Sequence, residues 1–77
     1  MGDSIKWLTT LGGQNAKCEG YRLVIVPIKG TSVACLRIRK HDGALVYGAN
    51  HDAPTEGEAI DKAKADAQRM LKLMGVT

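Results

Sequence analysis

The sequence contains four side chains of the kinds that bind zinc, and they are far apart along the chain. They are Cys18, Cys35, His41 and His51, with sixteen, five and nine residues between neighbours. Recognisable zinc sites use closely spaced pairs of such residues, because two ligands from one short turn reach the same ion. The spacing therefore predicts four unrelated side chains and no metal site. Two cysteines are also too few for a disulfide scaffold and favour reduced thiols, with one Cys18–Cys35 bridge as the alternative.

No other pattern of residues argues for catalysis. His41-Asp42 and His51-Asp52 repeat a dipeptide that metal phosphohydrolases use, but those enzymes add ligands from several helices of a much larger domain. No Ser/His/Asp or Cys/His spacing suggests an activated nucleophile, and 77 residues leave little room for a walled substrate pocket. We therefore expect neither an enzyme nor a cofactor.

The composition is that of one small globular domain. Of the 77 residues, 44% are hydrophobic and 25% are charged, and 11 basic against 8 acidic residues give a net charge of +3. This weak basicity permits an anionic partner without requiring one. The longest apolar run, residues 23–28, is far shorter than the roughly 18 residues of a membrane helix, and the first residues lack the apolar region of a signal peptide. We expect a cytoplasmic protein with no membrane partner.

Residues 18–50 carry the patterns of β structure. Three apolar, partly alternating runs predict the strands of an antiparallel meander: residues 20–27, 32–40 and 44–47. Asp42-Gly43 is a strong hairpin signal in which both residues would take positive φ, and Gly30-Thr31 is a second candidate turn.

Two further features concern the beginning of the chain and the first predicted strand. In residues 1–17, Trp7 and Leu8 suit either a short strand or one helical turn, whereas residues 12–15 have the composition of a loop. Pro27 cannot donate a hydrogen bond to a neighbouring strand, so its own strand should be an edge or bulged there.

Across residues 55–74 the apolar side chains recur with the period of a helix. Thr55 and Glu58 have the spacing of a capping box, in which the threonine hydroxyl accepts from the Glu58 amide and the glutamate reaches back to the Thr55 backbone. Apolar side chains recur along one face of this helix: Ile60, Ala63, Ala67, Met70, Leu71 and Met74. Charged side chains are assigned to the solvated faces: Lys62, Lys64, Asp66, Arg69 and Lys72. Gly75 should end the helix.

The predicted fold is α+β, a three-stranded antiparallel meander with this C-terminal helix on one face.

The two predicted turns fix which residues face one another across the sheet. The helix-covered face is predicted to hold Leu23, Ile38 and Tyr47 in one row, and Tyr21 and Leu45 are assigned to the same core. Because one helix covers only one face of a sheet, the second face needs a separate explanation.

The second face is predicted to be half basic and half apolar. Arg22 should lie opposite Arg39, Val24 opposite Arg37, and Arg39 opposite Val46. Directly opposed arginines destabilise a strand pair unless an anion lies near them, and an acidic partner, a carboxylate of the chain or a phosphate would supply one. The alternative is that the arginines are solvated, with their stems over apolar neighbours.

The apolar half of this face also needs cover. Trp7 and Leu8, within residues 5–11, are the nearest candidates in the chain. A second copy of the protein, paired through the same apolar strip, is the alternative.

The order of three strands and a helix with the run Lys-Ala-Lys-Ala-Asp-Ala, over residues 20–74, resembles the end of a double-stranded RNA-binding domain. It is also similar to the small three-stranded DNA-binding domains of phage integrases, which place their sheet in a groove of the duplex. Both resemblances imply contact with nucleic acid. The helix opens with Thr55-Glu56-Gly57-Glu58, where the RNA-binding domains carry a basic cluster, so neither family is assigned. In its size and lack of catalytic residues the chain also resembles small phage-encoded inhibitor proteins, which occlude a surface of a host machine.

These features predict a non-enzymatic binding protein that uses the second face of the sheet. The expected contact residues are Arg22, Arg37, Arg39, Lys40, His41, Val24 and Val46. The first hypothesis is an inhibitor or accessory protein, of the phage type, that docks on a protein partner with an acidic surface or on a nucleoprotein complex. Direct binding of double-stranded nucleic acid is the alternative, and a homodimeric structural protein is the second alternative.

Overall fold

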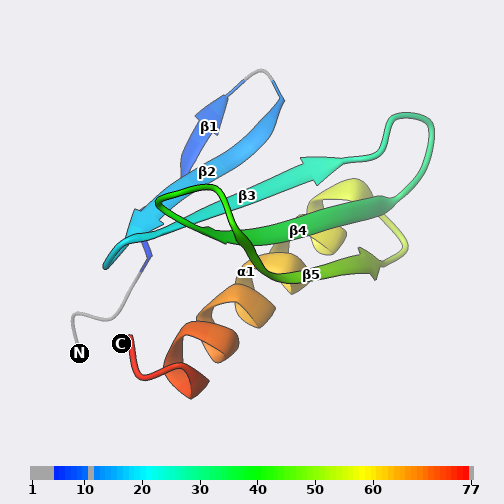
Figure 1. Cartoon of the computed structure of the whole chain (residues 1–77). Helices are drawn as coiled ribbons and strands as arrows, with labels where there is room; N and C mark the ends of the chain where they lie inside the picture. The colour runs from blue at the N-terminus through cyan, green and yellow to red at the C-terminus, as the bar shows by residue number, and fades with distance from the viewer. Residues whose placement is uncertain (1–4, 11, 77) are drawn as a thin grey trace.

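The computed structural model describes residues 5–10 and 12–76, which form a five-stranded antiparallel sheet and one helix (Figure 1). The strands lie in the sheet in chain order. The elements are β1 (Leu8–Thr10), β2 (Gly13–Cys18), β3 (Tyr21–Pro27), β4 (Val33–Lys40), β5 (Leu45–Asp52) and α1 (Glu56–Leu73). The α+β class, the antiparallel sheet and the C-terminal helix are confirmed. The prediction of three strands is wrong, because the sheet has five.

The two additional strands come from the beginning of the chain, where the sequence left Trp7 and Leu8 open between a short strand and a helical turn and predicted a loop at residues 12–15. The β2 strand contains Gln14 and Asn15, which have weak strand propensity, but it pairs along β3 and places Ala16 in the core. Glu19 and Gly20 join the two strands, and both have positive φ (49° and 86°), as a tight type I′ hairpin turn requires. Pairing with β3 therefore overrides the loop-like composition of β2.

The hairpin between β4 and β5 is confirmed, but its turn differs from the predicted one. Gly43 has a φ of 95°, whereas Asp42 does not take positive φ. The Gly43 amide donates to the Lys40 carbonyl at 2.8 Å, and the Asp42 carboxylate accepts from the Ala44 amide at 3.0 Å. The connection is therefore a three-residue loop, in which only the glycine needs the left-handed region.

A bulge compensates for the longer loop and corrects two predictions. The register shifts between Ile38 and Arg39, so that Ile38 still lies opposite Tyr47 as predicted, while Arg39 lies opposite Leu45 rather than Val46. Leu45 was assigned to the core, but the shift moves it to the other face, where it is 54% exposed.

The register between β3 and β4 is confirmed. Arg22 lies opposite Arg39, and the Thr31 amide donates to the Ile28 carbonyl at 3.1 Å in the connecting turn, which has Gly30 at a φ of 80°. Pro27 ends β3 and lies beyond Ile25, the last residue of β3 that pairs with β2, so β3 is an edge strand at that point. This position suits proline, which has no backbone N–H to donate to a neighbouring strand.

The capping box of α1 is confirmed in one of its two bonds. The Thr55 hydroxyl accepts from the Glu58 amide at 3.2 Å. It also donates to the Glu58 carboxylate at 3.0 Å, so the glutamate reaches the threonine side chain rather than its backbone amide. Gly75 follows the C-cap residue Met74 with a φ of 78°, which fits the predicted end of the helix.

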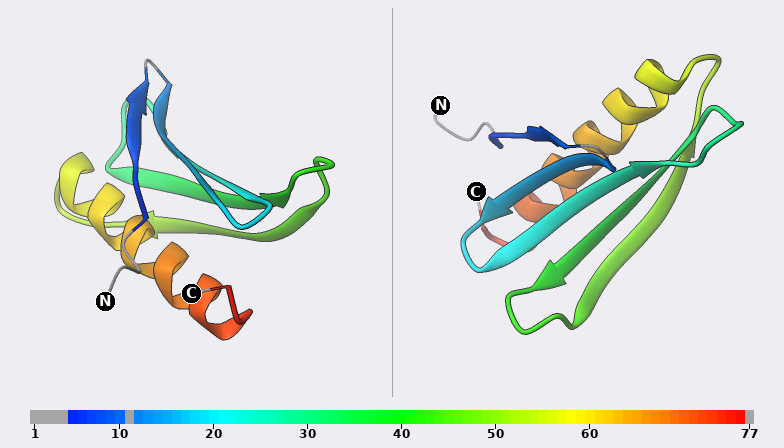
Figure 2. Two further views of the ribbon diagram at one scale, coloured as in Figure 1. Left: turned by 90° about the vertical axis from the view of Figure 1, so that its left-hand side faces the viewer. Right: turned by 90° about the horizontal axis from the view of Figure 1, so that it is seen from above.

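The core lies between one face of the sheet and α1 (Figure 2). The sheet contributes large aliphatic side chains and the helix contributes mainly alanines, which let it lie close to the strands. The fully buried residues of this layer are Leu23, Ile25, Ala34, Leu36, Ile38, Ala59, Ala63, Ala67 and Leu71. The helix in the described part of the chain is not long and apolar enough to cross a membrane.

The beginning of the described chain also packs on the helix side of the sheet. Ile5 and Trp7 lie against the core, and Leu8 points to the other face with 67% of its surface exposed. The prediction that Trp7 covers the second face is therefore wrong, and that face stays uncovered by the described residues.

Candidate functional site

The face of the sheet that α1 does not cover, called here the open face, combines cationic and aliphatic side chains. Because side chains alternate along a strand, the pairing of the strands assigns its members. The central ones are Leu8, Lys17, Arg22, Val24, Val26, Cys35, Arg37, Arg39, Leu45 and Asn50. Asp52 is the one acidic side chain that the described strands place on this face, and it lies at one end, 3.4 Å from the Ser32 hydroxyl.

Three like charges form a row across the open face. Lys17 of β2 lies opposite Arg22 of β3, which lies opposite Arg39 of β4. Within the described residues, no ion pair joins any of the three to a carboxylate. Directly opposed like charges destabilise a sheet by several tenths of a kcal/mol per pair. An anion between them would remove this repulsion, so the row, called here the cation row, is a candidate binding site.

Two arginines of this face are held in place by the backbone. The Arg37 guanidinium donates to the Leu36 carbonyl at 2.9 Å, and Arg39 donates to the Gly43 carbonyl at 3.1 Å. Arg37 also lies against Gly48, where an added Cβ would come within 3.2 Å of its side chain. Such restraint lowers the conformational entropy that these side chains would lose on binding.

Exposed aliphatic side chains share the open face with the cation row. Leu8, Leu45 and Val26 are 67%, 54% and 43% exposed. Leu8 also lines a hollow of about 490 Å³ together with Lys17, Arg22, Val24 and neighbouring atoms of β2 and β3. The site therefore offers charge and apolar area side by side.

Four of the seven predicted contact residues come together on this face: Arg22, Val24, Arg37 and Arg39. Lys40 lies opposite Tyr21, which places it on the helix-covered side at the end of the sheet, and His41 is exposed in the hairpin turn. Val46 lies at the bulge, not opposite Arg39.

The sequence reasoning missed Lys17, Leu8 and Leu45. Lys17 could have been found from Glu19-Gly20, since a two-residue turn there pairs it with Arg22.

All three aromatic residues of the sequence lie away from the open face. Trp7, Tyr21 and Tyr47 pack against the core on the helix side. The open face therefore has no aromatic platform on which unpaired bases could stack.

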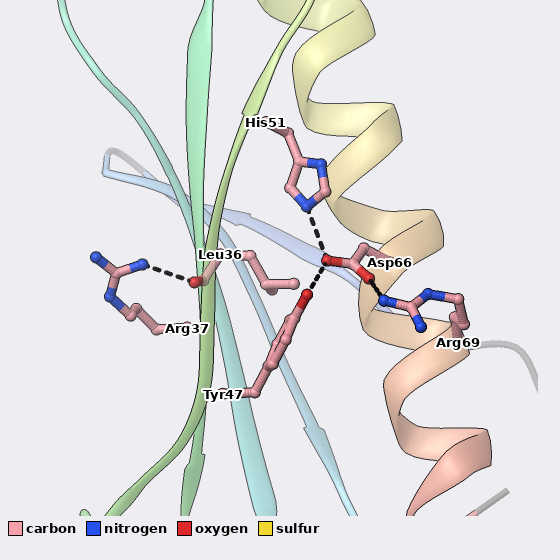
Figure 3. A network of polar contacts seen from close by, with 6 residues as sticks. All are labelled: Leu36, Arg37, Tyr47, His51, Asp66 and Arg69. Carbon is pink, nitrogen blue, oxygen red and sulfur yellow. Dashed lines mark hydrogen bonds and ion pairs between the residues drawn. The ribbon is translucent and has the colours of Figure 1, made fainter.

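A second polar site joins the helix to β5 on the opposite side of the sheet (Figure 3). The Asp66 carboxylate is only 8% exposed and accepts three hydrogen bonds. Tyr47 donates to Oδ2 at 2.7 Å, His51 Nε2 lies 2.9 Å from the same oxygen, and Arg69 donates to Oδ1 at 2.6 Å. We call these four residues the Asp66 cluster.

The Asp66 cluster stabilises the ionised carboxylate. Burial alone would raise the pKa of Asp66, but the hydrogen bonds from Tyr47, Arg69 and His51 outweigh it, so the pKa lies below its usual value. The same hydrogen bond to Asp66 raises the pKa of the Tyr47 phenol, because losing the proton would place two negative charges together. The cluster therefore joins β5 to α1 through an ionised carboxylate, both oxygens of which accept hydrogen bonds.

Asp66 was predicted to lie on a solvated face, and this is wrong. It is one residue from Ala67 and three from Ala63, both buried, so it falls within the apolar stripe of α1. An acid inside such a stripe, with an arginine three residues later, is the signal that could have indicated a buried polar contact.

The residues of zinc-ligand type do not converge. By strand pairing, Cys18 lies on the helix-covered face and Cys35 on the open face, and both are free thiols. His41 is in the hairpin turn, while His51 is the last residue but one of β5 and lies 2.9 Å from the Asp66 carboxylate. Among residues 5–10 and 12–76, no three His, Cys, Asp or Glu side chains are grouped to hold a metal ion.

Comparison of the chain with protein-family models, with curated proteins and with solved structures finds no match. Its function is therefore inferred from geometry and chemistry alone.

Proposed function

We propose that this protein is a non-enzymatic docking protein that binds an acidic, partly apolar surface of another protein through the open face. The observation that supports the proposal is the cation row, in which Arg22 lies between Lys17 and Arg39. Among the described residues, no carboxylate forms an ion pair with any of the three. This arrangement costs stability in the free protein and gains it when a partner supplies carboxylates, which pair with guanidinium groups through short, strong hydrogen bonds.

A protein surface suits the open face better than a nucleic acid does. The exposed aliphatic side chains of the open face, Leu8, Val26 and Leu45, would gain from burial against apolar groups and nothing from phosphates. The net charge of +3 is small for a protein that binds duplexes without sequence preference. Binding by occlusion, as an inhibitor or accessory factor of a larger complex, needs no further machinery in a chain of 77 residues.

The decisive test is the variant Arg22→Glu. A glutamate between Lys17 and Arg39 replaces two like-charge pairs by two opposite-charge pairs, so we expect the fold to be retained or slightly stabilised while partner binding is lost. The matched control is Lys72→Glu, which makes the same change of net charge on the exposed last turn of α1. Both variants and the wild-type protein would be used to capture partners from cell extract, with and without nuclease.

The proposal predicts a protein that is captured by the wild type and by Lys72→Glu, that survives nuclease, and that is lost with Arg22→Glu. Equal capture by all three proteins would refute the assignment of the open face. Capture that nuclease abolishes, together with binding of a labelled 20-base-pair duplex that weakens steeply between two salt concentrations, would instead identify a nucleic-acid-binding module.

A further inference from the structure

We propose that the free edge of β5 binds an extended acidic segment of a partner protein as a sixth strand of the sheet. This inference concerns the edge of the sheet at β5, which meets the open face only at Arg37, Leu45 and Asn50, and it does not rest on the cation row. It is carried by the backbone of β5, by two hollows that flank the strand, and by the charges around them.

The backbone of β5 presents unpaired groups at the edge of the sheet, with β4 as its one neighbour. The Ala53 amide donates to the Ser32 carbonyl at 3.3 Å, and in an antiparallel pair the residues that bond inward alternate with those that point outward. Gly48, Asn50 and Asp52 therefore direct their N–H and C=O groups away from β4. The ammonium group of Lys62 lies 3.0 Å from the Asp52 carbonyl, which agrees with this direction.

The outward groups of Gly48 and Asn50 lie along an accessible edge. The right-hand view of Figure 2 shows β5 as the outermost strand, with α1 behind the sheet. Proline, or a lysine pointing along the strand, commonly blocks such an edge against pairing, and β5 contains neither between Leu45 and Asp52. This part of the edge can therefore form ladder hydrogen bonds with another strand.

A hollow lies on each side of β5, as strand addition requires. On the helix side the lining residues include Tyr47, His51, Lys62 and Arg69. On the open side they include Arg37, Leu45, Gly48 and Asn50. Figure 3 shows Arg37 on one side of the strands and the Asp66 cluster on the other. An added strand projects alternate side chains to the two faces, so each hollow would receive every second one.

The charges around the edge favour an acidic segment. Lys62, Arg69 and Asp66 are the charged residues that line the helix-side hollow, and because Arg69 is paired with Asp66, Lys62 leaves a surplus of one positive charge there. Arg37 lines the other hollow. A second copy of β5 would bring Lys62 and Arg69 against the same cations of its partner, so charge complementarity selects an acidic chain rather than self-pairing.

The test uses synthetic peptides, which leave the protein unchanged. The probe is acetyl-Thr-Val-Glu-Val-Glu-Val-Thr-amide, titrated into ¹⁵N-labelled protein. Peptide residues that lie opposite Gly48 and Asn50 direct their side chains to the open side, as Gly48 and Asn50 themselves are oriented. In the register that places valines there, the valine amides face β5 and the glutamates enter the helix-side hollow. Two isomeric controls carry one N-methyl group, either on the central valine or on a neighbouring glutamate. A further control replaces both glutamates by lysine.

We expect slowed exchange of the Gly48 and Asn50 amide protons, and affinity about tenfold lower when the valine is methylated but unchanged when the glutamate is. The lysine peptide should bind at least tenfold more weakly. Arg22→Glu should bind the probe as the wild type does, so failure of the open-face proposal would leave this result intact. Equal binding of the two N-methyl isomers, shifts confined to the cation row, absence of binding, or dimerisation through β5 would each overturn the inference.

Discussion

Replacing Asp66 by asparagine perturbs the contact between β5 and α1 without changing the size of the side chain. The carboxylate accepts from Tyr47, His51 and Arg69 and is almost fully buried. An asparagine can keep its carbonyl oxygen toward Tyr47 and His51, but its NH₂ group then faces the Arg69 guanidinium. The substitution therefore removes the charge from two hydrogen bonds and turns the third into a contact between two donors.

The expected loss is about 2 kcal/mol of unfolding free energy. Hydrogen bonds to a charged group contribute about 1.5–3 kcal/mol each, and part of this remains with a neutral acceptor. The Arg69 side chain is 59% exposed, so solvent screening leaves its hydrogen bond little weight in this total. For a domain of this length, 1 kcal/mol corresponds to about 4–8 °C in Tm, which predicts a fall of about 8–16 °C.

The pH dependence of stability provides an independent check that Asp66 stabilises the fold in its ionised form. Because the hydrogen bonds hold the pKa of Asp66 below its usual value, its contribution to stability is complete above the unfolded pKa of about 3.9 and is lost as the pH falls through the folded pKa. The wild-type protein should therefore lose this part of its stability below about pH 4, and Asp66→Asn should not. The exposed helix residue Asp61, changed to asparagine, is the matched control.

Urea denaturation at pH 7 and at several values below pH 4 measures both effects. The reasoning would be refuted if Asp66→Asn had the same midpoint as Asp61→Asn at pH 7, or if it kept the acid sensitivity of the wild type. A changed m-value would indicate altered compactness rather than the loss of these contacts.

Two other predictions concern the β2–β3 region. Gly13→Ala should lower the free energy of unfolding, measured with denaturant, by at least about 2 kcal/mol. The new Cβ would lie 2.0 Å from the Ile25 carbonyl oxygen, and the backbone has a φ of 136°. Gly12→Ala is the control, because a Cβ there has nothing within 4 Å, and it should stay within about 0.5 kcal/mol of the wild type. Arg22→Thr should stabilise the free protein by several tenths of a kcal/mol at low salt, because it removes two like-charge contacts of the cation row. This gain should vanish in 1 M salt, where the Debye length is about 3 Å, and a gain that persists there would show that repulsion is not its cause.

Local patterns predicted the central part of the fold. The two hairpins of β3, β4 and β5 follow from turn residues and alternation, and their register holds Arg22 opposite Arg39 as predicted. The helix follows from its apolar stripe and from Thr55. In these elements local propensity and tertiary packing favour the same structure, so a single sequence is sufficient.

The missed features depend on contacts between elements that the composition of each element alone does not show. Strand β2 exists because β3 offers a free edge, which its own glycine, glutamine and asparagine do not indicate. The bulge that moves Leu45 to the open face depends on the three-residue form of the Gly43 turn. Asp66 is buried because Tyr47 and His51, on another element, provide its hydrogen bonds. No periodicity of the helix alone shows that those partners are in reach.

The chain-order arrangement of the strands has a consequence for how the protein reaches its folded state. Every strand pairs with the one that precedes it, so most sheet contacts are local and the topology favours rapid folding. The cation row is assembled during this process, since each of two successive hairpins brings a new positive charge beside Arg22. Added salt, which screens the repulsion between these charges, should therefore speed the closure of the sheet.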